Sequence, residues 1–174
     1  MMEKRAKIKE WINFFILLII IILVKIYIAT PVSVDGASMD PTLKDRDYMI
    51  ENKLIYYFKD IKRGDIVVLK SNGTRLVKRV IGLPGENVIA SNGSVYINGK
   101  LLEEPYLKKD IITEDFNMES TIGKKKLDKD EYFVMGDNRP YSSDSRQRGA
   151  IKRKDITGRV KLLLFPFTRI GIKK

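Results

Sequence analysis

A strand and the turn that ends it can be read directly from Arg75-Leu76-Val77-Lys78-Arg79-Val80-Ile81 and the following Gly82-Leu83-Pro84-Gly85. Successive side chains of a strand point to opposite faces, so Lys78 stands between two apolar residues on one face. Arg79 stands between two apolar residues on the other face. The alternation predicts a strand that carries one cation on each face, and one of these cations is a candidate for removal from water.

Strands of the same kind follow on both sides of this one. After Pro31, Val and Ile occur in short runs separated by Gly, Asn, Asp and Pro. These runs predict strands at 32–35, 47–51, 65–70, 76–81, 87–90, 94–97, 131–135 and 158–165, with tight turns at Asn72-Gly73, Asn92-Gly93 and Asn98-Gly99. We also expect a short helix within 52–58 and a loop or small insertion over 107–130. The predicted fold class is mostly β, an antiparallel β-sheet domain over 32–174.

The segment before this domain is apolar. Residues 1–10 are polar and basic, and 11–29 are apolar with two polar interruptions. As a helix, 11–29 is about 28 Å long, close to the thickness of a hydrocarbon core. Trp11 and Tyr27 fall where an interfacial aromatic belt lies, and Lys25 is near enough to the end to reach water. The pattern predicts a single transmembrane helix.

Two other interpretations of this segment are weaker. A cleavable signal peptide has a shorter apolar core and a small-x-small site, and Ala29-Thr30-Pro31 is a poor one. A buried core helix normally has a polar face, and 16–24 has none. We therefore expect a retained anchor at 11–29, a cytoplasmic tail at 1–10 because of its excess of basic residues, and an extracytoplasmic domain at 32–174.

Charge and composition limit the possible chemistry. The chain has 174 residues, a net charge of +11, no His and no Cys. This charge suits an anionic surface, either a membrane or a nucleic acid, although basic clusters such as 124–126 and 152–154 are also typical of a solvated face. The missing residues exclude disulfides and thiolate metal ligands and argue against a zinc site. A nucleophilic hydrolase would need a hydroxyl nucleophile and a base other than imidazole.

Ser38 is the candidate nucleophile and Lys78 the candidate base. Ser38 lies in the small-residue turn Gly36-Ala37-Ser38-Met39-Asp40-Pro41, which can present a hydroxyl but is also the composition of an ordinary turn. Burial lowers the pKa of a Lys, and the neutral amine can then accept a proton from a serine, whereas Arg stays protonated. The alternative is that Lys78 reaches an edge of the sheet or pairs with an acid.

A third polar stretch runs from Gly136 to Arg146, directly after the apolar strand at 131–135. Its acids, amide, arginines and serines can form a hydrogen-bonded network of ion pairs. The same composition is also typical of a polar turn capped by Asx motifs.

These three stretches together resemble the conserved boxes of the type I signal peptidases. The resemblance rests on Ser38-Met39-Asp40-Pro41-Thr42-Leu43, on Lys78-Arg79-Val80-Ile81-Gly82-Leu83-Pro84-Gly85, and on Gly136-Asp137-Asn138-Arg139 with Ser142, Asp144, Ser145 and Arg146. Their order, their spacing and their position after an N-terminal anchor are also similar. The similarity extends from the anchor to about Phe165.

The resemblance implies a membrane-bound serine endopeptidase with a Ser–Lys dyad. Such an enzyme removes N-terminal signal peptides from exported preproteins, after small residues at −1 and −3, without a metal or cofactor. Ser38 would be the nucleophile, Lys78 the general base, and the Ser38 N–H part of the oxyanion hole. The supporting residues would be Ser142, which orients the Lys78 amine, and Asp137, Asp144 and Arg146, which hold the surroundings by ion pairs.

We expect the substrate to bind as an extended strand beside 32–35 and the strand of Lys78. The oxyanion and substrate-binding positions would be Val34, Asp35, Gly36, Ala37 and Met39, of which Met39 either lines a pocket or simply packs. Three features depart from some members of the family. Gly36 replaces a serine that completes the oxyanion hole, which leaves the second donor open; Glu86 replaces an Asp; and the short 104–130 region indicates a reduced second β domain.

Two functions of other classes compete with the peptidase. A self-cleaving repressor-type protein would need a DNA-binding segment in place of the anchor. A non-enzymatic basic module on a membrane or nucleic acid would not need Ser38 and Lys78. The expected partners are preprotein signal peptides and the lipid bilayer, not nucleic acid. The sequence leaves open which preproteins are cleaved, the source organism, a paralogue and the oligomeric state.

Overall fold

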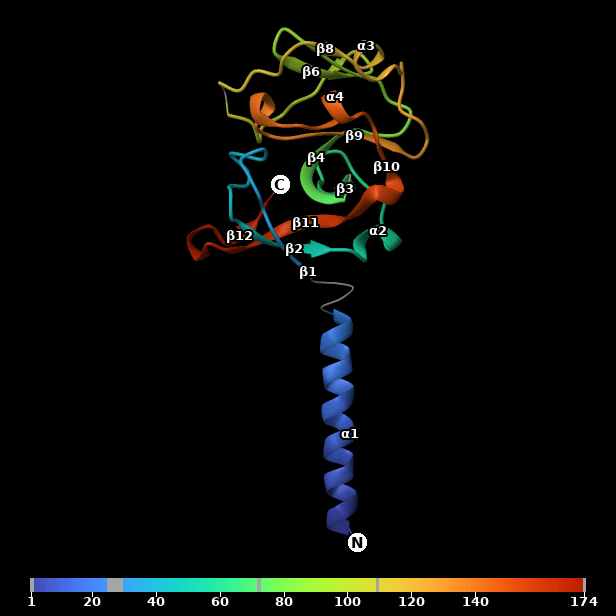
Figure 1. Ribbon diagram of the computed structural model, residues 1–174, viewed down its shortest axis with the longest axis vertical. Coiled ribbons are helices and arrows are strands. Elements are labelled where there is room, and N and C mark those ends of the chain that lie inside the picture. The colour runs from blue at the N-terminus through green and yellow to red at the C-terminus, as the bar shows by residue number, and fades with distance from the viewer. Residues whose placement is uncertain (1, 25–29, 72, 109, 174) are drawn as a thin grey trace.

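The computed structural model describes residues 2–24, 30–71, 73–108 and 110–173 (Figure 1). Its strands are β1 (Thr30–Ser33), β2 (Tyr48–Asn52), β3 (Ile66–Ser71), β4 (Thr74–Gly82), β5 (Val88–Ser91), β6 (Ser94–Ile97), β7 (Lys100–Leu101), β8 (Phe116–Asn117), β9 (Glu131–Met135), β10 (Ile151–Lys152), β11 (Ile156–Phe165) and β12 (Gly171–Ile172). Its α-helices are α1 (Met2–Leu23), α2 (Ile55–Phe58), α3 (Met118–Ile122) and α4 (Ser145–Arg148).

The described strands form two antiparallel sheets. The larger has the order β1-β2-β11-β3-β4-β9-β10, with β12 paired to β11, and the smaller has the order β7-β6-β5-β8. In Figure 1 the small sheet lies at the end of the domain farthest from β1, above β9 and α4. The chain leaves the large sheet after β4 and returns to it at β9, which pairs directly with the second half of β4.

Alternating side chains explain why β3 and β4 lie at the centre of the fold. On β3, Ile66 and Val68 join one core cluster, whereas Val67 and Leu69 join another. On β4, Val77 packs against the first cluster, Leu76 and Val80 belong to the second, and Ile81 belongs to a third. This third cluster joins the small sheet to β9. Because both faces of the central part of β4 are covered, Lys78 and Arg79 are held inside the domain although they are charged.

The predicted mostly β, antiparallel domain is confirmed. The strands expected at 94–97 and 131–135 agree with β6 and β9, and the helix expected within 52–58 is α2. The Asn92-Gly93 and Asn98-Gly99 turns join β5 to β6 and β6 to β7. Asn72 lies outside the described residues.

Four two-residue strands and two short helices escaped prediction. The strands are β7, β8, β10 and β12, and the helices are α3 and α4. The first strand was placed at 32–35, whereas β1 is Thr30–Ser33, because its partners on β2 begin at Glu51 opposite Thr30. The region 107–130, expected as a loop, contains β8 and α3, whose N-terminus is capped by the Asn117 side chain.

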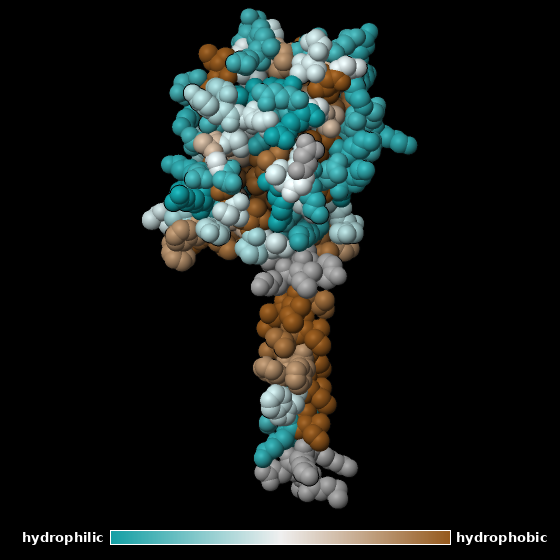
Figure 2. Space-filling model, viewed as in Figure 1, coloured by the Kyte–Doolittle hydropathy of each residue, from teal (hydrophilic) through white to brown (hydrophobic). Residues whose placement is uncertain are grey.

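The helix α1 joins the basic leader and much of the apolar segment into one element. In Figure 2 the part of the helix nearer the domain is apolar, and hydrophilic residues lie toward its other end. The predicted span at 11–29 includes residues 25–29, which lie outside the described residues. The predicted roles of Lys25 and Tyr27 therefore lie outside them as well. Within the described ranges, none of the helices combines the length and the apolar composition needed to cross a membrane.

Candidate active site

Ser38 and Lys78 are brought together from two elements that are distant in the sequence. Ser38 lies in the turn after β1, and Lys78 lies in the middle of β4. Lys78 Nζ is 2.7 Å from Ser38 Oγ, within hydrogen-bonding distance. It also donates to the carbonyl of Val77 at 3.1 Å, so the amine lies against the edge of its own strand. A hydroxyl beside an amine at this distance has the geometry of a nucleophile and its base.

The Lys78 amine is removed from water without gaining an acidic partner. Only 3% of the residue is exposed, and it forms no ion pair within the part of the chain that the structure describes. Burial lowers the pKa of Lys78 to about 8; the charge of Asp144 opposes this effect and that of Arg148 adds to it. About a tenth of the amine is therefore neutral at pH 7, far more than for an ordinary Lys, and the neutral form is the one that can accept a proton.

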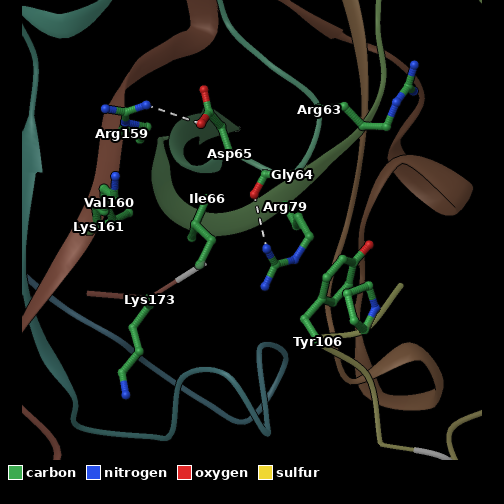
Figure 3. A pocket seen from close by; sticks show the side chains of 11 residues that line it. Arg63, Gly64, Asp65, Ile66, Arg79, Tyr106, Arg159, Val160, Lys161 and Lys173 are labelled. Atoms are coloured by element: carbon green, nitrogen blue, oxygen red, sulfur yellow. Dashed lines mark hydrogen bonds and ion pairs between the residues drawn. The ribbon is translucent and has the colours of Figure 1, made fainter. Parts of the chain in front are cut away.

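Arg79, the next residue on β4, is buried as well, so both cations of this strand are removed from water. It is 1% exposed and forms a two-pronged ion pair with Asp137, with distances of 2.8 and 2.6 Å. Its guanidinium also donates to the carbonyl of Gly64 at 3.0 Å and lies 3.7 Å from the ring centre of Tyr106 (Figure 3). The two cations thus differ in what faces them: Arg79 has a carboxylate, and Lys78 has a serine.

Asp144 and Arg146 form a second network beside the dyad. The Asp144 carboxylate accepts from Arg146 Nε and Nη2, both at 2.9 Å, and from the Gly136 N–H at 3.0 Å. Burial alone would raise the pKa of Asp144, but the hydrogen bonds and charge of Arg146 outweigh it and hold that pKa below its usual value. The three acids and arginines expected in ion pairs, Asp137, Asp144 and Arg146, all form them.

Two residues that hold the Ser38 turn were quoted in the polar stretch but given no role by sequence reasoning. Asn138 donates its backbone N–H to the carbonyl of Ser38 at 3.1 Å and its side-chain amide to the carbonyl of Ala37 at 3.0 Å. Gly136 lies so close to this turn that a Cβ there would fall under 3.0 Å from both the Ser38 carbonyl and the Ser142 hydroxyl. No sequence pattern identifies these contacts, because they join segments about 100 residues apart.

Ser142 is buried, and its hydroxyl has no hydrogen-bond partner among the residues that the structure describes. It lies against Gly136, as the Ser38 carbonyl does. Ser142 was expected to orient the Lys78 amine, and no hydrogen bond joins these two groups in the described structure. The Ser142 hydroxyl does act on the Asp144 carboxylate, because it helps to hold the pKa of Asp144 below its usual value.

The backbone N–H groups of Gly36 and Ser38 differ in whether they are already hydrogen-bonded. The N–H of Gly36, whose φ of 81° suits glycine, donates to the Asp45 carboxylate at 2.8 Å. By contrast, the N–H of Ser38 donates to no acceptor in the described part of the chain. Of these two, only the Ser38 N–H is available to a bound group.

A groove of about 200 Å³ opens beside the dyad. One wall is β1 and the residues that follow it, including Val34 and Asp35, and the other is the Arg75 to Lys78 part of β4. Met39 is fully buried in a core cluster and also borders the groove, so it packs in the core and lines the groove. The groove thus gathers Ser38, Lys78, Val34, Asp35 and Met39, whereas Gly36 and Ala37 lie outside its lining.

Both walls of this groove are strands to which no other described strand is paired on the groove side. Within the described strands, β1 pairs only with β2. The first half of β4 pairs only with β3, since β9 joins β4 from Arg79 onward. Edges of this kind can hydrogen-bond to an added extended segment.

Two further ion pairs support the site from outside. Glu86 accepts two hydrogen bonds from Arg63 and one from the Leu83 N–H at 2.7 Å, which fixes the turn after β4. Arg139 is buried and pairs with Glu104, and it also donates to Thr113. The Arg139 pair ties the chain around the small sheet to the polar stretch and was not predicted.

The chain resembles characterised proteins over most of its length. The family model described as signal peptidase, peptidase S26, matches residues 8–165. Signal peptidase I of Bacillus amyloliquefaciens is 41% identical over 97% of this chain and 94% of its own length. Signal peptidase I P of Bacillus subtilis subsp. natto is 44% identical, with 97% and 95% covered. The crystal structure of a signal peptidase I from Enterococcus faecalis V583 has a TM-score of 0.54 and 40% identity, covering 58% of this chain and 97% of that one.

Proposed function

Since this chain belongs to the signal peptidases of the peptidase S26 family, we propose that it removes signal peptides from exported preproteins with a Ser38–Lys78 dyad. The observation that carries the proposal is the 2.7 Å contact between Ser38 Oγ and a buried Lys78 amine that has no described ion pair. The chain has neither His nor Cys, so no imidazole or thiolate competes for these roles.

In the proposed reaction, neutral Lys78 takes the proton of Ser38 Oγ while this oxygen attacks the scissile carbonyl carbon. The protonated amine then gives a proton to the leaving amino group of the mature protein. Water attacks the resulting ester, Lys78 accepts its proton, and Ser38 is restored as the signal peptide leaves. The lowered pKa of Lys78 supports both proton transfers near neutral pH.

The Ser38 N–H is the proposed donor to the oxyanion. It is free in the described structure, whereas the Gly36 N–H is taken by Asp45. One such donor contributes about 2.7–4 kcal/mol to the stabilisation of the transition state. The hydrogen bonds from Asn138 support this role, because they fix the carbonyls of Ala37 and Ser38 and so the direction of the turn.

The substrate is proposed to bind as a strand between the two free edges. Main-chain hydrogen bonds would hold any extended segment, and only the side chains that point into the groove would be selected. The volume of about 200 Å³ favours small side chains there, in agreement with the proposed preference at −1 and −3.

We predict that Ser142→Ala lowers the rate of preprotein cleavage by about 10–100-fold, the cost of one hydrogen bond to a charged group. The reason is that Ser142 would receive a hydrogen bond from protonated Lys78 during turnover and hold the amine toward Ser38. Its pH profile should change as well, which a purely structural role would not cause. Ser143→Ala, which alters an exposed hydroxyl in the same stretch, is the control. Wild-type kinetics for Ser142→Ala would remove this assignment.

The apolar segment at 11–29 is proposed to anchor the enzyme, with the N-terminus in the cytoplasm and the domain outside. Exposed apolar side chains near β1 support a position close to a lipid surface; they are Tyr48, Leu162, Leu164, Phe165, Phe167, Ile170 and Ile172.

This orientation predicts the result of proteolysis on intact cells whose walls are permeable. Protease added outside should cut within 32–174 and leave 1–10 protected, as detected with an N-terminal epitope. Lysed cells, in which both parts are cut, are the control. Protection of the large domain in intact cells would contradict the proposed orientation.

Incubating purified protein with a preprotein tests the function itself. Cleavage in trans at the end of the signal peptide, lost in Ser38→Ala, is the expected result. Cleavage only of the enzyme chain itself would favour the self-cleaving alternative. No cleavage of either chain by folded protein would favour a binding module.

A further inference from the structure

A hollow beside α2 is lined by basic residues and by no acidic ones, and it does not include Ser38 or Lys78. Its volume is about 480 Å³. The charged residues that line it are Lys53, Arg153 and Lys154, and no acid lines it. The proposed catalytic chemistry uses none of these residues, so the basic cluster at 152–154 has no role in it. We propose that this hollow binds the phosphate-bearing head group of an anionic lipid.

The hollow is a built feature. Arg153 donates to the carbonyl of Tyr56 at 2.9 Å, and its guanidinium lies 5.5 Å from the centre of the Tyr56 ring. Tyr56 is itself buried and donates its hydroxyl to Asp65 at 2.9 Å. These contacts fix α2 and the cation together before any ligand arrives, which lowers the entropy lost on binding.

The three basic side chains of this hollow have no acidic partner among the described residues. In the described chain, none of Lys53, Arg153 and Lys154 forms an ion pair with a carboxylate. The hollow in Figure 3 is different: there Arg159 pairs with Asp65, Arg63 with Glu86, and Arg79 with Asp137. Three cations facing a common hollow without acids are complementary to a phosphate group.

Two exposed aromatic side chains identify the source of the phosphate as a lipid. Tyr57 and Phe58 follow Tyr56 on α2, and each is 80% exposed. Aromatic rings of this kind lie favourably at the boundary between head groups and acyl chains, next to basic residues that contact the phosphates. A soluble phosphate would gain nothing from them.

The position of the hollow agrees with this source. Thr30, where the domain begins after the apolar segment, pairs with Glu51, and Lys53 follows Glu51 by two residues. Thr30 comes six positions after Val24, and a chain of that length spans at most about 20 Å. The hollow therefore lies at the end of the domain that the apolar segment enters, and its lipid occupant rests on the membrane attachment proposed above.

The experiment uses the full chain with Trp11→Phe and Phe58→Trp, so that the single indole reports on α2 and the lining stays unchanged. It is mixed with phosphatidylcholine vesicles that carry bromine on the acyl chains, with increasing fractions of phosphatidylglycerol. We expect quenching of the indole fluorescence to increase with phosphatidylglycerol. Adding Lys53→Gln and Lys154→Gln should weaken this response by about thirty-fold, since each Lys near an anionic surface contributes roughly five-fold in affinity.

The matched control is Lys125→Gln with Lys126→Gln, which removes the same charge from an exposed basic cluster near α3. It should leave the response unchanged. Equal losses in both double variants, or no response to phosphatidylglycerol, would overturn the site. If inorganic phosphate reversed the quenching by vesicles that contain phosphatidylglycerol as effectively as the lipid produced it, the lipid would not be the source of the bound phosphate. Co-sedimentation with vesicles free of phosphatidylglycerol reports membrane attachment separately, so a failure there is distinguishable from a failure of the hollow.

Discussion

We expect Lys78→Arg to lower the rate of preprotein cleavage by about 10²–10⁴-fold, the usual contribution of a general base. Arg keeps the positive charge and much of the length of Lys, but it cannot give up its proton in a protein. If Lys78 acted through its charge, Arg would restore activity. If the free amine takes the Ser38 proton, Lys78→Arg should be as inactive as Lys78→Ala.

The pH profile of the wild type provides a second measurement of the same step. The pKa of Lys78 is lowered to about 8 by burial, and the reactive form is the neutral one. Activity should therefore rise with pH through about 8 and fall about tenfold for each unit below it. Lys70→Arg, an exposed position on the adjacent β3, is the control for the substitution. A folded Lys78→Arg enzyme with near wild-type activity would exclude the Ser–Lys mechanism.

The second large effect is expected from the addition of one methyl group, in Gly136→Ala. The new Cβ would lie under 3.0 Å from the Ser38 carbonyl and the Ser142 hydroxyl, so the Ser38 turn must move away. Overpacking of this kind costs about 1–3 kcal/mol of stability. A displacement of the nucleophile by about 1 Å lowers the rate by roughly 10²-fold. Thermal unfolding and cleavage kinetics of the same preparation measure the two effects.

Gly123→Ala separates stability from catalysis. Gly123 has a φ of 72° and open space around its missing side chain, and it ends α3 away from the dyad. The substitution should destabilise the chain by about 1–3 kcal/mol through backbone strain and leave the cleavage rate of the folded enzyme unchanged. Equal activity losses in the two variants would mean that Gly136 acts through stability alone.

The local patterns were sufficient for the main elements of the fold. Alternation in β4, the Asn-Gly turns and the apolar runs predicted the central strands, because each of these signals is contained in a few consecutive residues. Strands of two residues, such as β10 and β12, carry no pattern of their own. They exist because β9 and β11 offer them a partner.

The residues of the candidate site and the pairing of Ser38 with Lys78 were predicted, whereas most of the contacts that hold this pair in place were not. Because the chain has no His and no Cys, Lys78 was the candidate base, and its place between apolar residues predicted a lowered pKa for its amine. The ion pair of Arg79 with Asp137 and the approach of Gly136 to Ser38 depend on how β4 and β9 pair. Such contacts join distant segments, and a single sequence contains no local signal for them.

In the binding mode proposed above, the two strand edges of the groove restrict when a preprotein can be cut. An edge offers hydrogen bonds only to a chain whose own amides are unoccupied, so a helical or already folded segment cannot enter. The cleavage region must therefore be unwound on arrival, and a mature protein that folds up to its first residue would hide its own processing site. Cleavage would therefore have to take place while the preprotein is still extended during export, before folding of the mature part buries the cleavage site.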